Sequence, residues 1–87
     1  MKSENDLLIT GIVTSEVQVN PGQTVIRFRI VHNFAGGREP LFLDCVLILK
    51  KGSGLPVPQK GDEVRVRAYL RIRTGLIEAV VKSLTIK

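Results

Sequence analysis

The positions of the turn-forming residues limit this 87-residue chain to short extended segments. Proline fixes its own φ and glycine adopts positive φ easily, so clusters of the two interrupt regular structure. Such clusters lie at 20–22, 33–40, 50–62 and 74–75, and the runs between them never keep apolar residues at helical spacing for long. The pattern predicts five strands, over residues 7–14, 24–32, 41–49, 64–73 and 76–87.

Five short strands at this spacing indicate an all-β barrel or sandwich with little or no helix. A chain of this length fills one core, so residues 1–87 are expected to form a single domain. Gly11 interrupts the first run, where a glycine typically marks a bulge or a sharp bend. The third run is apolar on both faces apart from Asp44, so we expect it to be covered on both sides or packed against a partner.

The fourth run separates two kinds of side chain, because successive residues of a strand point to opposite faces. One face would fill the barrel with Val64, Val66, Ala68, Leu70 and Ile72. The other face would carry Arg65, Arg67, Tyr69, Arg71 and Arg73. Arg27 and Arg29 alternate in the same way along the second run.

This arginine stripe predicts a surface for single-stranded nucleic acid. The guanidinium group binds phosphate through two hydrogen bonds and also stacks on bases, and single-strand binders combine cationic tracks with aromatic rings. The alternative is a solvated face that serves solubility. Solubility faces normally mix both signs of charge, whereas this run has no acidic residue after Glu63. The net charge of +5 also favours an anionic partner.

Other candidate binding residues lie in the loops and at the strand ends. Phe34 and Phe42 flank the glycine-rich loop, where each would either stack a base or join the core. Lysines beside the long loop would contact phosphates or remain simply solvated. The predicted nucleic-acid-binding residues outside the arginine stripe and the second run are Phe34, Arg38, Phe42, Lys50, Lys51 and Lys60.

Catalysis and cofactor binding find little support in the sequence. Cys45 lies among aliphatic residues, where a free cysteine usually behaves as a small buried hydrophobe. His32 has no partner at a recognisable catalytic spacing, and one Cys with one His does not make a typical zinc site. We expect no enzyme activity, no metal and no cofactor. With no signal peptide and no apolar run long enough to span a membrane, a cytoplasmic location is expected.

Five segments resemble, in chain order, those of the bacterial single-stranded DNA-binding protein (SSB) family, including its compact primosomal relative PriB. They are NDLLITG (5–11), NPGQTVIRFRI (20–30), FLDCV (42–46), QKGDEVRVRAYLRIR (59–73) and EAVVKSLTI (78–86). The resemblance covers nearly the whole chain, and FLDCV and QKGDEV are its most specific parts. It implies a five-stranded OB-fold barrel, frequently dimeric or tetrameric, that binds single strands without base chemistry.

The chain departs from the family pattern in several places. A Pro/Gly-rich loop replaces the short helix before the fourth strand, and only Thr74-Gly75 stands where members commonly have a long DNA-wrapping hairpin. The stacking tryptophans are absent. By position Phe42 replaces one of them, Phe34 lies near another, and Ile48 falls where a stacking phenylalanine often sits. The acidic C-terminal tip is also missing, so recruitment of repair enzymes by that route is not expected.

The sequence therefore predicts a non-catalytic protein that protects or presents single-stranded DNA in replication, recombination or restart, as a homodimer or homotetramer. Replication proteins are further candidate partners, and a membrane is not. Two alternatives stay open. One is a primosome-like protein-interaction subunit that docks through the exposed third strand. The other is an RNA-binding OB domain, because charge and stacking do not distinguish the two sugars.

Overall fold

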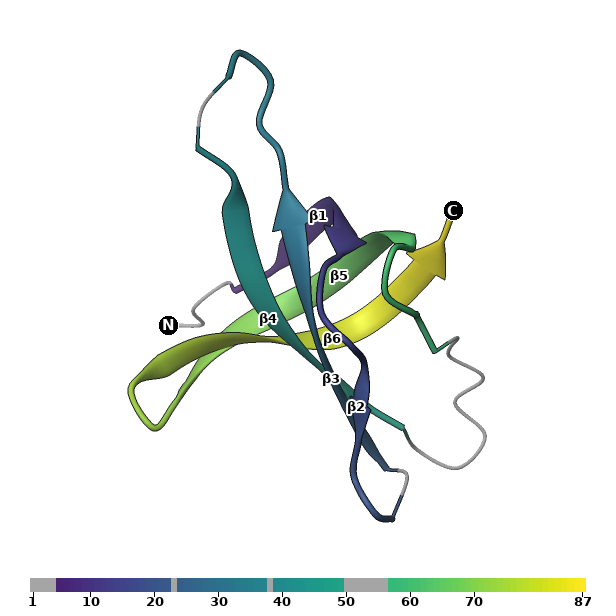
Figure 1. The fold of residues 1–87 in the computed structure, drawn as a ribbon. Helices are drawn as coiled ribbons and strands as arrows, with labels where there is room; N and C mark the ends of the chain where they lie inside the picture. Colours follow the sequence, from purple (N-terminus) through teal and green to yellow (C-terminus); the bar gives the residue numbers. More distant parts are fainter. Residues whose placement is uncertain (1–4, 23, 38, 50–56) are drawn as a thin grey trace.

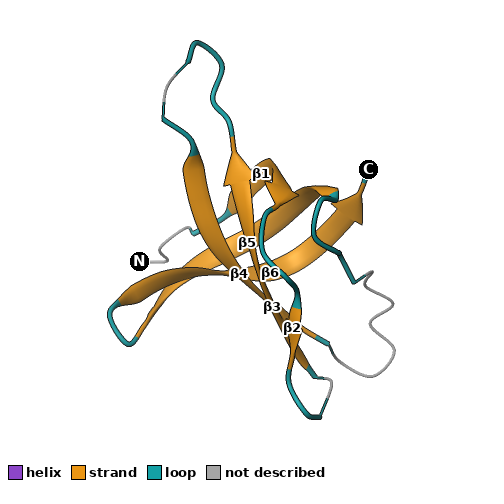
Figure 2. Ribbon diagram, viewed as in Figure 1, coloured by secondary structure: helices purple, strands orange, loops and turns teal. Residues whose placement is uncertain are grey.

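The computed structural model describes residues 5–22, 24–37, 39–49 and 57–87. Over these residues the chain forms six β-strands and no helix (Figures 1 and 2). Accordingly, none of these residues belongs to a helix that could cross a membrane. The strands are β1 (Leu7–Val13), β2 (Gln18–Val19), β3 (Val25–His32), β4 (Leu41–Ile48), β5 (Glu63–Arg73) and β6 (Leu76–Ile86).

The five longer strands of the described chain begin and end within one residue of the predicted runs. The sixth strand, β2, has only two residues and pairs with β3, and it was not predicted from the sequence. Strands this short carry no periodic pattern, so only the pairing itself reveals them.

The strands close into a barrel because β1 pairs on both of its sides. It runs antiparallel to β5 over Leu7–Ile12, and its last residues pair with β3. The circuit continues from β5 to β6, then through a parallel pairing to β4, and from β4 to β3. In the described residues this gives a closed five-stranded barrel with the strand order of an OB-fold, so the predicted fold class is confirmed.

Gly11 is explained by a close approach between strands, and the bulge predicted there is absent. The β1–β5 register runs unbroken through Gly11. A Cβ atom at this position would lie 2.7 Å from the carbonyl oxygen of Val31 on β3. A side chain would therefore push apart the two strands that close the barrel.

The inward face of β5 agrees with the prediction only over its first half. Val64, Val66 and Ala68 are fully buried. Leu70 and Ile72, predicted to fill the barrel, are 37% and 75% exposed, so that part of the prediction is wrong. The reason is that the β1 pairing ends opposite Ala68, so β5 continues past its neighbour and leaves the barrel.

Residues 69–78 form an arm in which β5 and β6 continue side by side to a tight turn (Figure 1). Thr74 and Gly75 both have positive φ, 49° and 79°, as a type I′ hairpin turn requires. The expectation that only Thr74-Gly75 joins these two strands is confirmed, because Arg73 pairs directly with Leu76. The turn is short, but the strands themselves extend beyond the barrel.

The described chain covers the outer face of β4 only in part, so the prediction that this strand is covered on both faces is not met within one copy: Phe42 and Ile48 are 57% and 40% exposed. Leu43, Cys45 and Leu47 point into the core. Val46 points away from the core yet is only 2% exposed, because Arg27 of β3 and Val80 of β6 flank it in the sheet.

Candidate nucleic-acid interface

One outer face unites residues from four strands. The register sets Arg27 of β3 beside Val46 of β4, Val46 beside Val80 of β6, and Val80 beside Tyr69 of β5. A second row on the same face contains the pairs Arg29–Asp44 and Arg71–Glu78. The structure thus brings arginines from both predicted sources, the second run and the fourth, onto one surface, called here the outer face.

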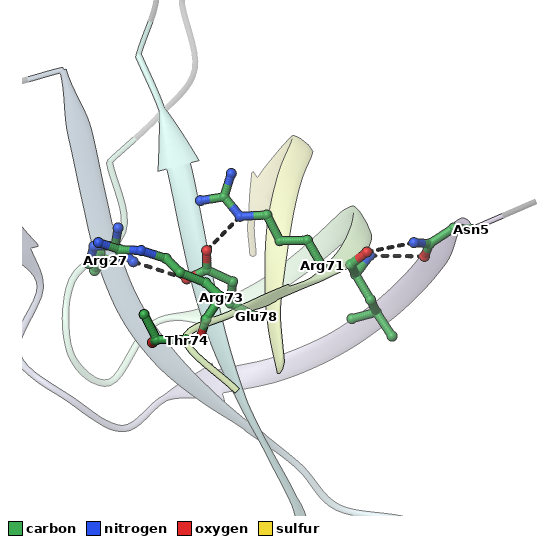
Figure 3. A network of polar contacts seen from close by, with 7 residues as sticks. Asn5, Arg27, Arg71, Arg73, Thr74 and Glu78 are labelled. Carbon is green, nitrogen blue, oxygen red and sulfur yellow. Dashed lines mark hydrogen bonds and ion pairs between the residues drawn. The ribbon is translucent and has the colours of Figure 1, made fainter. Parts of the chain in front are cut away.

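Glu78 lies at the centre of this face and is held by two arginines (Figure 3). Its Oε2 accepts a hydrogen bond from Arg27 Nη1 at 3.0 Å, and its Oε1 accepts one from Arg71 Nε at 2.5 Å. The residue is only 7% exposed. Burial by itself would raise the pKa of Glu78, but the hydrogen bonds from the two arginines outweigh it and hold the pKa below its usual value. The carboxylate is therefore charged at neutral pH.

Other arginines of the predicted surface also meet carboxylates. Arg29 Nε donates to Asp44 Oδ1 at 2.8 Å, and this hydrogen bond raises the pKa of Arg29. Arg67 donates two hydrogen bonds to Asp6, which lower the pKa of that carboxyl group. Although the fourth run has no acidic residue after Glu63, the folded surface does mix both signs of charge, because Asp6, Asp44 and Glu78 come from other segments.

Arg65 and Arg73, at the two ends of the stripe, make no ion pair with any described residue. They line different hollows, so the stripe does not face a single groove. Arg65 lines a hollow of about 550 Å³ beside β1, together with Leu8, His32, Phe34 and Lys87. Arg73 lines the hollow described next.

A hollow of about 340 Å³ lies over β3 and β4 and is bounded by the tip of the arm. We call it the β3–β4 hollow. Its charged lining consists of Arg27, Arg29, Arg73, Glu16, Asp44 and Glu78. In OB-folds the equivalent two strands, with the loop that joins the first two strands and the loop that joins the last two, form the oligonucleotide-binding face. The hollow occupies that location in this barrel.

The predicted aromatic residues have three different environments. Phe42 lies on the outer face of β4 and is 57% exposed, which leaves its ring open to a stacked base. Phe34 lies beyond β3 and meets the His32 ring edge-on, with the centroids 4.8 Å apart. Tyr69 is half-buried, and the ammonium group of Lys82 lies 5.6 Å from its ring centroid. A base that stacked on that side of Tyr69 would have to displace Lys82.

The predicted loop lysines do not join the outer face where they are described. Lys60 lies in the turn before β5 and pairs with Glu16 at 3.7 Å. Arg38, Lys50 and Lys51 lie outside the described residues.

Cys45 and His32, the two residues considered for catalysis, both have structural contacts in the fold. Cys45 is buried in the core, and this burial raises the pKa of its thiol to about 12, so at neutral pH it carries no nucleophilic thiolate. His32 is committed to a 2.6 Å contact between its Nδ1 and the carbonyl oxygen of Thr10. Across the described ranges no cluster of three or more His, Cys, Asp or Glu residues is placed to hold a metal ion.

The acidic partners on the face were missed at the sequence level, although one of them left a signal. A two-residue turn at Thr74-Gly75 sets Arg73 opposite Leu76 and, two steps further, Arg71 opposite Glu78. Reading the hairpin register from the turn would thus have found the Arg71–Glu78 pair. Asp44 and Asp6 reach their arginines through pairings between distant segments, which no local pattern reveals.

Comparison with known proteins rests on structure alone. No protein-family model matches the chain, and no curated protein matches it. Among solved structures, the second single-stranded DNA-binding protein (SSBb) of Mycobacterium smegmatis superposes with a TM-score of 0.78 at 18% identity, covering 98% of this chain and 90% of that one. The dimeric N-terminal domain of PriB from Thermoanaerobacter tencongensis gives 0.72 at 16% identity, covering 95% and 96% of the two chains.

A third solved structure is the SSB of Plasmodium falciparum in complex with ssDNA, with a TM-score of 0.71 at 16% identity and coverage of 100% of this chain and 97% of that one. At these identities the likeness establishes the fold. The chain has the OB-fold of SSB and PriB proteins over nearly its whole length.

Proposed function

We propose that this protein binds single-stranded DNA on its outer face and catalyses no reaction. The observation that carries the proposal is the β3–β4 hollow, where Arg27, Arg29 and Arg73 converge at the face on which OB barrels hold oligonucleotides. The fold likeness supports it, since the similar structures are those of SSB and PriB proteins and one was solved with ssDNA.

The chemistry of binding follows from the groups on this face. Arg27 and Arg71 each use one nitrogen for Glu78, which leaves their other N–H groups available to phosphate oxygens. Arg73 at the tip of the arm lines the same hollow. The exposed ring of Phe42 offers a platform for a base, and stacking of this kind is tolerant of sequence. Affinity arises from released counterions and from stacking rather than from reading base edges.

The proposed role is to keep a single strand extended, protected and available to other proteins of the cytoplasm during replication, recombination or restart. A carrier of this kind needs reversible binding without strong base preference. Charge and stacking provide both properties.

Fluorescence anisotropy with labelled dT20, an RNA oligomer and a duplex tests the proposal. The six arginines of the outer face and the stripe, less the three carboxylates that pair with them, leave about three net positive charges. The log–log salt slope for dT20 should therefore lie near −2, at about −0.7 per phosphate. Single-stranded DNA should bind more tightly than duplex. A slope near zero, or equal affinity for duplex and single strand, contradicts the proposal, and tighter binding of the RNA oligomer reassigns the ligand.

Arg73→Ala tests whether the β3–β4 hollow is the site. It should weaken dT20 binding about 5- to 10-fold and reduce the salt slope by about 0.7, the share of one phosphate. Lys87→Ala is the matched control, because it also removes one positive charge, but Lys87 directly follows β6 and lies outside this hollow. Equal losses in the two variants would show that total charge, and not the hollow, governs binding.

A further inference from the structure

Glu78 places a buried negative charge in the middle of a face that is otherwise suited to phosphate. Its neighbours in the sheet show that the position does not need an acid for packing, since Val46 and Val80 are buried on the same face at 2% and 4% exposure. Burying a carboxylate costs more than burying an aliphatic side chain of similar size, even when the charge is paired. An apolar residue would fill this position at a lower cost.

The Glu78 carboxylate also binds a second arginine, from outside its own hairpin. Its cross-strand neighbour Arg71 lies opposite it in the arm and would satisfy one carboxylate oxygen. The other oxygen takes Arg27 from β3, 51 residues away in the chain. Glu78 therefore connects the arm to the floor of the β3–β4 hollow (Figure 3).

We propose that Glu78 sets the affinity of the outer face for single-stranded DNA by restraining Arg27 and Arg71. This inference rests on the proposed function and specifies how the same site is regulated. With Glu78 ionised, the two arginines offer a phosphate one net positive charge instead of two. The charge of a buried carboxylate is poorly screened by salt, so it opposes an incoming phosphate even at physiological ionic strength.

The restraint does not block the site. Arg27 and Arg71 remain partly exposed, with side-chain exposures of 38% and 39%. Each keeps N–H donors that Glu78 does not use. A strand can thus be held at the hollow and released readily, which suits a protein that must pass single strands to other factors.

Glu78→Gln is the direct test, with Glu63→Gln as the matched control. Both variants remove one negative charge, but Glu63 lies at the start of β5 and pairs with Lys87, outside the β3–β4 hollow. Glu78→Gln should tighten dT20 binding at least fivefold at 50 mM salt and steepen the salt slope by about 0.7, as if one more phosphate were engaged. Glu63→Gln should change affinity less than twofold.

Glutamine has one side-chain oxygen in place of the two carboxylate oxygens that accept from Arg27 and Arg71, so Glu78→Gln could also reduce folding. Two further variants keep the test valid in that case. Arg71→Gln alone should weaken dT20 binding. Arg71→Gln combined with Glu78→Gln restores the local net charge of the native face, so its affinity should return to the native level. Circular dichroism melts establish that each variant is folded at the assay temperature.

The outcomes separate this inference from the proposed function. If the native protein does not bind dT20, the proposed function fails and the inference fails with it. If the native protein binds, but folded Glu78→Gln binds no more tightly and the double variant stays as weak as Arg71→Gln, only the inference is overturned. Glu78 would then serve to position the two arginines.

Discussion

At the scale of single residues, Gly11 is the position where the backbone leaves no room for a side chain. The nearest atom to a Cβ there would be a main-chain oxygen on β3, 2.7 Å away, which cannot move without disturbing the β1–β3 pairing. Gly11→Ala should therefore lower the free energy of unfolding by about 2–3 kcal/mol, as overpacking commonly does. Urea denaturation monitored by circular dichroism measures this loss.

Gly22→Ala supplies the control for that measurement. A Cβ at Gly22 would meet nothing closer than 3.8 Å, and the residue has no positive φ. Its substitution should change stability by no more than about 0.5 kcal/mol, as surface changes usually do. Equal effects at the two glycines would mean that β1 and β3 do not approach as closely as the structure shows.

At the scale of elements, the turn of the arm contains a residue that is poorly suited to its backbone conformation. Thr74 is β-branched and adopts the left-handed conformation, which such residues rarely do. Asparagine tolerates this conformation and is favoured in type I′ turns. Thr74→Asn should therefore stabilise the arm by about 0.5–1 kcal/mol and slow hydrogen exchange of its amides.

Thr85→Asn is the matched control for the turn, because Thr85 lies in the extended part of β6. Asparagine is disfavoured in strands, so this variant should leave stability unchanged or reduce it slightly. If both substitutions had the same effect, the turn conformation would not be what limits the arm.

The strands themselves were predictable because the turn residues and the period-2 alternation are local. The inward positions of Val64 and Val66 followed directly from that alternation. The exposure of Leu70 and Ile72 could not be predicted in this way. Alternation shows which face of the strand a residue lies on, but it does not show whether the barrel extends that far. This depends on where β1 stops pairing, more than fifty residues earlier in the chain.

The arginines of the candidate site could be predicted from the sequence, but the net charge of the folded surface could not. The arginines of β3 and β5 lie on an outer face because they alternate with core residues. Their acidic partners Asp6 and Asp44 come from other segments, and only the tertiary structure brings the charges together. The stripe looks strongly positive along one strand, but in the folded protein two of its four arginines, Arg67 and Arg71, are paired with carboxylates.

At the scale of the whole molecule, the arm presents an apolar side that the described chain does not cover. Leu70, Ile72 and Ile77 are 37%, 75% and 60% exposed and lie on the face that continues from the barrel core. Such a face favours association with a second copy. We expect a homodimer or larger oligomer at micromolar concentration, measured by sedimentation.

Ile72→Ser should shift this equilibrium towards monomer without reducing thermal stability at low concentration, because the side chain is largely solvated within one copy. Leu8→Ser removes an exposed aliphatic residue of β1 instead and should leave the assembly through the arm intact. A native protein that sediments as a 9.6 kDa monomer would contradict the prediction.

The pairing of β1 with β5 also has a kinetic consequence. Residues 7–12 must find residues 63–68, so the chain closes a loop of roughly fifty to sixty residues before these strands can hold each other. The β3–β4 and β5–β6 hairpins need no such search and can form early, each from neighbouring segments. The barrel is therefore expected to close late, on the millisecond-to-second timescale typical of non-local β topologies. Until it does, β5 presents an unpaired edge to other copies of the chain, so nascent protein is most prone to aggregate before β1 docks.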